Sequence, residues 1–414
     1  MSKRKIIRLS SSNNLTDLNS TFLDTPTFTE IRRGDLILWG FDNTFPDYLI
    51  QLMEKSSRHK RCVKFKTDLV GGSGFDRTNI SQATIDFIEN PYGDETLDDI
   101  LKKISYDFEL FGGFALKLFK NQLNNKVVKI EYIDIYDLRI SEGKDCVYYS
   151  KDWKRRGANA NAIKYELFNE ESTTGVSIML CAPHQKGSRY YPKPDYLTGT
   201  GINYIELDYQ ISEFQASSIE NGFAPGLILT LPDVASDEEK EFVVSQLRDS
   251  YATARNANKP MVIFDNPDSR TEITQINSDS NDNRFLQVLE TIQDGIFQTH
   301  RINNPILVGQ AMPGKLGNTN EELEALKIFQ AQYVDPQQYY IERCFNKITK
   351  YNLLDPIKIT KYKIDLDVDV NVDDILSILT SPLSNGQKIE ILKLLGYRED
   401  QVKLLVENNT TTTI

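Results

Sequence analysis

The stretch that decides the fold is "IENGFAPGLILTLPD", from Ile219 to Asp233. It ends a helical pattern of apolar residues that begins at Tyr204, and it opens a short apolar run typical of a strand. A helix of about 20 residues spans roughly 30 Å. The sequence therefore predicts a long helix with a strand at its far end.

The residues that follow predict a small αβ unit and a returning helix. "SDEEKEFVVSQLRDSY" (236–251) indicates a helix, because Ser236 suits an N-cap and the glutamates after it favour the positive helix start. "KPMVIFDNPD" (259–268) indicates a second strand, and "DNRFLQVLETIQDGIFQTHRI" (282–302) a second long helix. We expect one long helix to leave the body of the protein and another to return.

The N-terminal half predicts an α+β domain. Residues 1–30 are rich in Ser, Thr, Asn and Asp and indicate a flexible or extended arm. Apolar residues at helical spacing follow, in one helix beginning at Pro46, a second ended by glycines at 71–74, and a third over 96–113. The pattern then changes to alternation over residues 112–121, 126–143, 146–153 and 162–170, which predicts an antiparallel sheet of several strands ending near residue 200.

The C-terminal part begins with a loop. "NNPILVGQAMPGKLGNTNEELEAL" (303–326) concentrates proline and glycine and then opens a helix, which we expect from about Asn320 to Lys350 with a bend at Pro336. "KIDLDVDVNVDD" (363–374) alternates as a strand, and the remaining residues predict short helices and a frayed tail.

Composition places the chain among globular proteins. Of 414 residues, 40% are hydrophobic and 26% charged, and no apolar run approaches the roughly 18 residues of a membrane span. The basic N-terminus is followed by no apolar stretch of a secretory signal. The four cysteines form no CxxC pair, which argues against a disulfide framework or structural zinc and for a reducing compartment.

The formal charge of −11 comes from one segment. Residues 203–300 hold 17 acidic and 6 basic residues, and the rest of the chain is balanced. An acidic segment repels DNA, so it is not expected to grip nucleic acid tightly.

No motif for catalysis or cofactor binding is found. The proline- and glycine-rich loop is not a Walker A loop, because Leu316 follows Lys315. The carboxylates from Asp365 to Asp373 resemble the start of a calcium loop, but Leu376 stands where the last ligand belongs, and a half-buried strand explains the alternation. His300 is expected to interact with a helix dipole rather than act as a base. We expect no enzyme, cofactor or bound metal.

Taken in order, several segments resemble the portal proteins of tailed bacteriophages, in the short form of the long-tailed-phage family. The passage from Trp39 to Phe75 is similar to their N-terminal segment, and "FELFGGFALKLF" to the helix and strand that follow it. "IENGFAPGLILTLPD" with "NANKPMVIFD" is similar to their passage from stem to clip. "NNPILVGQ" and "YVDPQQYYIERCFNKI" resemble the loop and long helix after the second stem helix. The order of these segments over residues 35–400 carries the resemblance.

The resemblance implies a portal fold with named parts. They are a flexible arm (1–30), a wing (31–202), stem helix 1 (203–223), a clip (224–268), a linker with stem helix 2 (269–300), a tunnel loop (301–319), a long helix with a wing-completing strand (320–374), and a helical crown with a frayed tail (375–414).

The resemblance also implies roles for individual residues. The tunnel loop would present Gly309, Gln310, Met312, Lys315 and Asn318 to passing DNA. An acidic stem wall would consist of Glu206, Asp208, Glu213, Glu290 and Asp294. Contacts between clips, or with terminase and adaptor, would use Leu227, Leu229, Glu238, Glu239, Arg248, Met261 and Ile263.

Portal proteins form a homo-oligomeric ring, usually of twelve copies, at one capsid vertex. The implied partners are double-stranded DNA bound without sequence preference, the terminase large subunit, the head–tail adaptor, and the major capsid and scaffolding proteins, with no membrane. The implied location is the virion, after assembly in the cytoplasm of a host bacterium. Two alternatives stay open: another structural virion protein, such as an adaptor or minor capsid protein, and a phage nucleic-acid enzyme.

Overall fold

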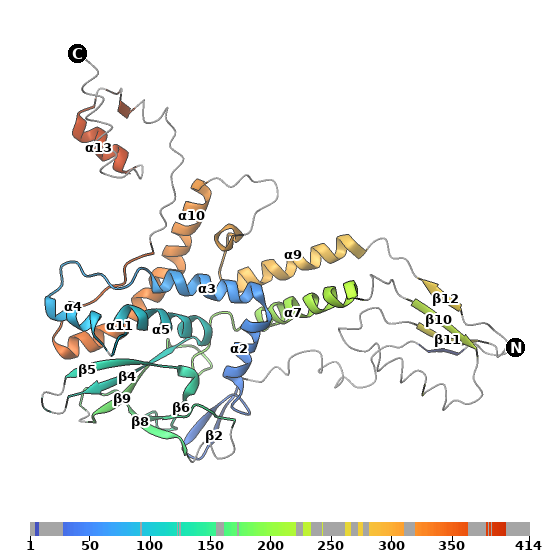
Figure 1. Cartoon of the computed structure of the whole chain (residues 1–414), viewed down its shortest axis with the longest axis horizontal. Coiled ribbons are helices and arrows are strands. Elements are labelled where there is room, and N and C mark those ends of the chain that lie inside the picture. The colour runs from blue at the N-terminus through green and yellow to red at the C-terminus, as the bar shows by residue number, and fades with distance from the viewer. Residues whose placement is uncertain are drawn as a thin grey trace.

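A helix-covered sheet, a pair of long helices and a smaller sheet at their far end form most of the structure (Figure 1). The computed structural model describes residues 5–7, 28–91, 93–121, 123, 126–154, 161–171, 174–220, 227–232, 242, 261–265, 272–275, 281–309, 319–362, 378–379, 381 and 383–394.

The three helices predicted before the sheet are present as α2 (Phe45–Lys55), α3 (Ser57–Gly71) and α5 (Leu97–Phe111). Each boundary has a local cause. Ser56 accepts a hydrogen bond from the backbone of His59 and begins α3, while a capping box of Thr96 and Asp99 begins α5. The left-handed Gly112 ends α5. A short helix, α4 (Gln82–Glu89), lies between α3 and α5.

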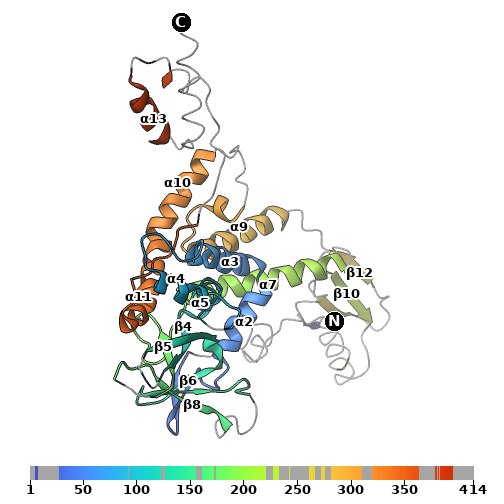
Figure 2. The same cartoon turned by 60° about the vertical axis from the view of Figure 1, so that its left-hand side comes forward.

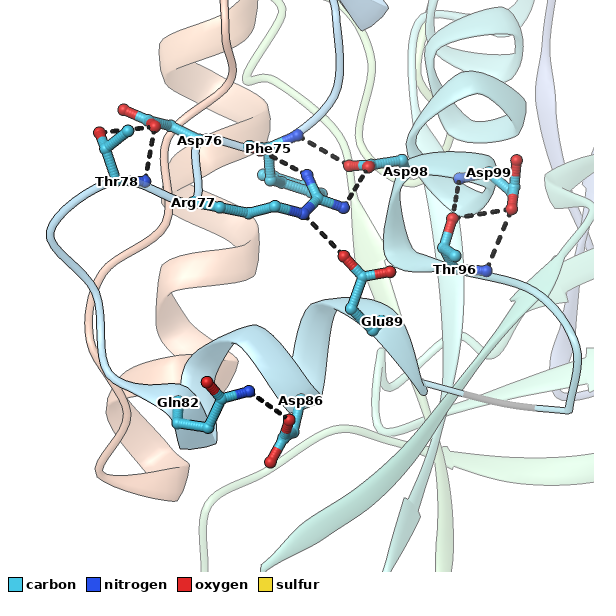
Figure 3. A network of polar contacts seen from close by, with 10 residues as sticks. All are labelled: Phe75, Asp76, Arg77, Thr78, Gln82, Asp86, Glu89, Thr96, Asp98 and Asp99. Atoms are coloured by element: carbon cyan, nitrogen blue, oxygen red, sulfur yellow. Dashed lines mark hydrogen bonds and ion pairs between the residues drawn. The ribbon is translucent and has the colours of Figure 1, made fainter.

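A network of hydrogen bonds and ion pairs holds the segment between α3 and α4 in place (Figure 3). Asp98 accepts hydrogen bonds from the backbone N–H of Phe75 (2.7 Å) and from Arg77 (2.6 Å). Arg77 also donates to Glu89 on α4 (2.7 Å). Residues 73–76 are thereby held where their backbone pairs with residues 358–360 from the C-terminal half.

The large sheet has the strand order β5-β4-β9-β8-β7-β6. Predicted segments form β4 (Phe114–Lys120), β5 (Val127–Ile133), β6 (Leu138–Ile140), β7 (Cys146–Tyr149) and β8 (Ile163–Leu167), with a short 3-10 turn, η1 (Ile135–Asp137), before β6. The central strand β9 (Val176–Cys181) is not among the predicted segments. The β8–β9 pair is parallel, which departs from the expected antiparallel sheet. A hairpin of β2 (Glu30–Arg33) and β3 (Leu36–Trp39) precedes α2.

The two predicted long helices are α7 (Gly199–Glu220) and α9 (Asn281–Thr299), which we call the stem. They lie side by side in both views (Figures 1 and 2). Gly295 of α9 allows the close approach, because a Cβ atom there would collide with the ring of Tyr204 on α7.

At the far end of the stem, four strands form the distal sheet in the order β1-β11-β10-β12. The two predicted strands are β10 (Leu227–Pro232) and β11 (Met261–Asp265), which pair in parallel. The other two strands were not predicted from the sequence. Residues 5–7 of the expected flexible arm form β1 (Lys5–Ile7) against β11, and residues 272–275 of the expected linker form β12 (Glu272–Gln275) against β10.

After the stem come a 3-10 turn, η3 (Pro305–Val308), and the long helix in three parts. These parts are α10 (Thr319–Phe329), a π-helical turn η4 (Gln330–Val334) and α11 (Asp335–Asn352). The expected bend is thus a π-helical turn that ends just before Pro336. A C-terminal helix, α13 (Asn385–Leu394), is present, and the predicted strand over 363–374 lies outside the described residues.

One hydrophobic core connects these parts. It runs from Trp39 and Phe114 at the sheet, through Leu49 and Ile205, to Phe345 of α11. The base of the stem is therefore built into the same core as the large sheet.

Candidate functional site at the base of the stem

Two acidic residues fix the base of α7 to the helical layer. Tyr48 of α2 donates to Glu206 with an O–O distance of 2.8 Å. Ser56 donates to Asp208 (2.7 Å), which also pairs with Arg58 of α3. Glu206 and Asp208 are 5% and 2% exposed. The prediction that these two carboxylates line a channel is therefore corrected: burial between helices excludes them from an open wall.

The other predicted stem acids differ in exposure. Glu290 and Asp294 lie one turn apart on α9 and are exposed to solvent, and Glu213 of α7 is half-buried. Only these three remain candidates for an acidic surface on the stem.

A buried pair of histidines joins the end of α9 to α3. The Nδ1 atom of His59 lies 2.8 Å from Nε2 of His300, and the ring of Tyr196 packs against both. Burial, with the nearby charge of Lys66, lowers the pKa of His59 to about 3 and the pKa of His300 well below its usual value. Both rings are therefore neutral, one donating to the other. The expected interaction of a charged His300 with the helix dipole is wrong.

A buried ion pair lies on the same face of α3. Lys66 contacts Glu109 of α5 (2.7 Å), and the hydroxyl of Tyr333 donates to the same carboxylate (2.7 Å). The Lys66 ammonium also lies 4.4 Å from the centre of the Tyr333 ring. Because Tyr333 belongs to η4, this cluster ties the π-helical turn to α3 and α5.

Of the predicted tunnel loop (301–319), the structure describes residues 301–309 and residue 319. Asn304 caps η3 by accepting from the backbone of Ile306 (3.1 Å). Gly309 has φ +71°, and a Cβ atom there would collide with the guanidinium of Arg61 on α3. The other predicted loop residues, Gln310, Met312, Lys315 and Asn318, lie outside the described residues.

A cavity of about 520 Å³ opens beside this point. One wall comes from the end of α9 and η3, including Arg301 and Leu307, and the other from α10 and η4, including Ile328 and Tyr333.

The predicted clip contacts fall partly on the distal sheet. Leu227 and Leu229 lie on β10, and Met261 and Ile263 on β11. Glu238, Glu239 and Arg248 lie outside the described residues.

Among the described residues, no group of three His, Cys, Asp or Glu side chains could hold a metal ion. The carboxylates from Asp365 to Asp373 are outside that part of the chain. No helix in the described ranges is both long and apolar enough to cross a membrane.

One feature of the sequence could have indicated part of this site. Lys66 continues the buried stripe of Cys62, Val63, Leu69 and Val70 on α3, and a lysine at such a position needs a buried partner. The partner, Glu109, is 43 positions away and could not be identified from spacing.

No protein-family model matches the sequence, and no curated protein matches it. Solved structures do match. A chain from the neck of a native gene transfer agent particle, computed with C12 symmetry, aligns over 84% of this chain and 93% of its own, with 14% identity and a TM-score of 0.50. The corresponding neck of the empty particle, computed with C6 symmetry, aligns over 83% and 93% at 13% identity, with a TM-score of 0.51.

The chain has the fold of these neck chains. The crystal structure of an HK97 family phage portal protein from Corynebacterium diphtheriae also aligns, over 75% of this chain and 95% of its own, with 12% identity and a TM-score of 0.47.

Proposed function

We propose that the chain is a portal protein. Copies of it form a ring, of twelve subunits, at one capsid vertex. Double-stranded DNA enters through the ring during packaging, driven by terminase, and leaves through it at ejection. The observation that carries this proposal is the fold shared with chains of a particle neck that was computed with C12 symmetry.

Exposed apolar residues on the stem support a ring. Leu207 and Phe214 on α7 are 36% and 39% exposed, and Leu286 and Val288 on α9 are 56% and 48% exposed. Such residues on a pair of long helices are costly in an isolated subunit, and neighbouring stems would cover them.

The exposed acids of the stem suit a channel wall. Glu290 and Asp294, with the half-buried Glu213, would present negative charge to DNA. A wall that repels phosphates prevents the summed contacts that make nucleic-acid binding tight, so DNA slides.

The remaining roles follow the resemblance stated above. The loop from Gly309 to Asn318 would reach into the channel and make weak, sequence-independent contacts with DNA. The clip, with Glu238, Glu239 and Arg248, would contact terminase during packaging and the head–tail adaptor afterwards. The major capsid and scaffolding proteins would surround the ring.

Negative-stain electron microscopy of the purified protein, with its native mass, tests this proposal. Rings with a central hole and a mass of about twelve subunits are expected. Uniform monomers or dimers, at concentrations where rings of this size form, would contradict it and favour a phage enzyme. A ring of a different copy number would change the stoichiometry while keeping the channel.

A further inference from the structure

One face of α3 carries positive charge that none of the described residues neutralises. The segment "SRHKRCVKFK" (57–66) has five basic residues and no acidic residue. Arg58 and Lys66 are used internally, by Asp208 and Glu109. Lys60, Arg61 and Lys64 are exposed, and no residue in the described ranges forms an ion pair with them.

These three side chains, which we call the α3 basic face, lie on one side of the helix. Lys64 lies four residues after Lys60 and three residues after Arg61, and side chains at both spacings are neighbours on a helical surface. Like charges at this spacing destabilise an isolated helix. An anion bound at this cluster would offset the repulsion between the like charges. Anion binding therefore gives a physical reason for the cluster.

The position of the face indicates which anion. Helix α3 contacts both stem helices and η3. Arg61 lies against Gly309, a residue of the proposed tunnel loop (301–319). Figures 1 and 2 both show α3 at the base of the stem. The charges therefore lie where DNA would leave the acidic stem and meet the loop.

A second group of exposed basic residues, on α11, serves as a control for the α3 basic face. Arg343, Lys347 and Lys350 of α11 are also exposed and have helical spacing. They line a shallow pocket that also contains Glu342, whose carboxylate accepts from the backbone of Ile359. In Figures 1 and 2, α11 lies beside α4 and α5, away from the stem.

We propose that the α3 basic face binds the phosphate backbone of double-stranded DNA as it passes the loop. This inference rests on the proposed portal function. Lysine and arginine contact phosphates without reading sequence, so the face would hold DNA of any sequence. The contacts would be sensitive to salt, because each neutralised phosphate releases condensed counterions.

Lysine acetylation followed by mass spectrometry tests the proposal in three states: dilute subunits, assembled empty rings, and rings with linear double-stranded DNA at low salt. Lys60 and Lys64 are expected to react equally in the first two states and several-fold more slowly with DNA. Lys347 and Lys350 should react alike with and without DNA.

Two outcomes would overturn the proposal. Protection of Lys60 and Lys64 already in the empty ring would assign the face to a neighbouring subunit. Equal reactivity in all three states would leave the face solvated. Failure to form rings at all would be seen before DNA is added, and it would contradict the proposed function rather than the DNA contact.

A pair of matched variants measures the same contact by another route. The triple change Lys60→Gln, Arg61→Gln and Lys64→Gln removes as many charges as Arg343→Gln, Lys347→Gln and Lys350→Gln. For rings binding DNA, the first should reduce the slope of log affinity against log salt by about 0.9 per lost phosphate contact. The second should leave the slope unchanged. Equal reductions would indicate a general charge effect and overturn the assignment to α3.

Discussion

At the scale of single residues, the junction between the stem and the helices that cover the large sheet depends on polar groups that no sequence pattern identifies. The sequence shows Lys66 among other lysines and arginines and His300 at the end of a helical pattern, and neither position by itself reveals burial. The structure buries Lys66 and His300, because α3 packs against α5 and the stem at once. Their partners come from distant segments, which no local pattern identifies.

The histidine pair predicts a loss of stability in acid. Burial holds the pKa of His59 at about 3 in the folded state, and an unfolded histidine titrates near 6.5. Below pH 6.5 the unfolded chain therefore binds more protons, and stability falls as the pH falls toward 3. Each buried histidine should remove up to about 1.4 kcal/mol per pH unit.

Urea unfolding between pH 7.5 and pH 5 measures this effect. The His300→Gln variant should show a shallower dependence on pH than the original protein. His184→Gln, at an exposed histidine, should not. An unchanged pH dependence in His300→Gln would contradict the assignment.

The Lys66–Glu109 pair predicts an asymmetric response to mutation. Lys66→Met leaves a buried carboxylate without its cation and should cost about 3–5 kcal/mol of unfolding free energy. Changing both residues, Lys66→Met with Glu109→Leu, should recover much of that loss, since no buried charge remains. Denaturant titration measures the unfolding free energy of the two variants. A double variant as unstable as the single one would contradict this expectation and show that the ion pair itself stabilises the fold.

At the scale of elements, the sequence predicts what is long and regular. The stem helices and the helices before the sheet have clear periodicity and were placed correctly. The strands β1 and β12 have three and four residues, too few for any period, and they are specified by pairing with β11 and β10. Strand β9 was missed although its six residues pair on both sides.

Close packing within the stem makes Gly295 sensitive to substitution. Alanine normally stabilises a helix relative to glycine. Here Gly295→Ala should destabilise by about 1–3 kcal/mol, because the added methyl group collides with Tyr204. Gly386→Ala in α13, where nothing lies within 4 Å, is the control and should not lose stability. Thermal unfolding compares the two, and a more stable Gly295→Ala protein would contradict the packing of α7 on α9.

If the loop is a tunnel loop, shortening it should impair DNA packaging without affecting ring assembly. Shortening the chain between Val308 and Asn318 should leave rings intact, since the core contacts of η3 and α10 remain. Packaging or retention of DNA should fall. Electron microscopy of the rings and the DNA content of heads measure the two effects, and normal genome-filled heads would contradict the loop assignment.

At the scale of the whole molecule, the order of the segments along the chain was a better guide to the fold than the identity of individual residues. The neck chain shares 14% of its residues with this chain over 84% of the sequence, yet the fold is retained. Core positions need apolar side chains of suitable volume rather than particular residues. The net charge of residues 203–300 correctly indicates an acidic segment, but it does not show which acids reach the surface. Glu206 and Asp208 contribute to that charge from buried positions.

The pairing of β1 with β11 has a practical consequence for handling the protein. Lys5 lies beside Phe264 at the far end of the stem, about as distant from the large sheet as the stem allows (Figure 1). An affinity tag or gold label fused before residue 5 would therefore mark the tip of the molecule in micrographs. The same fusion would crowd the surface proposed to receive terminase, so purification for packaging assays is better served by a tag placed elsewhere.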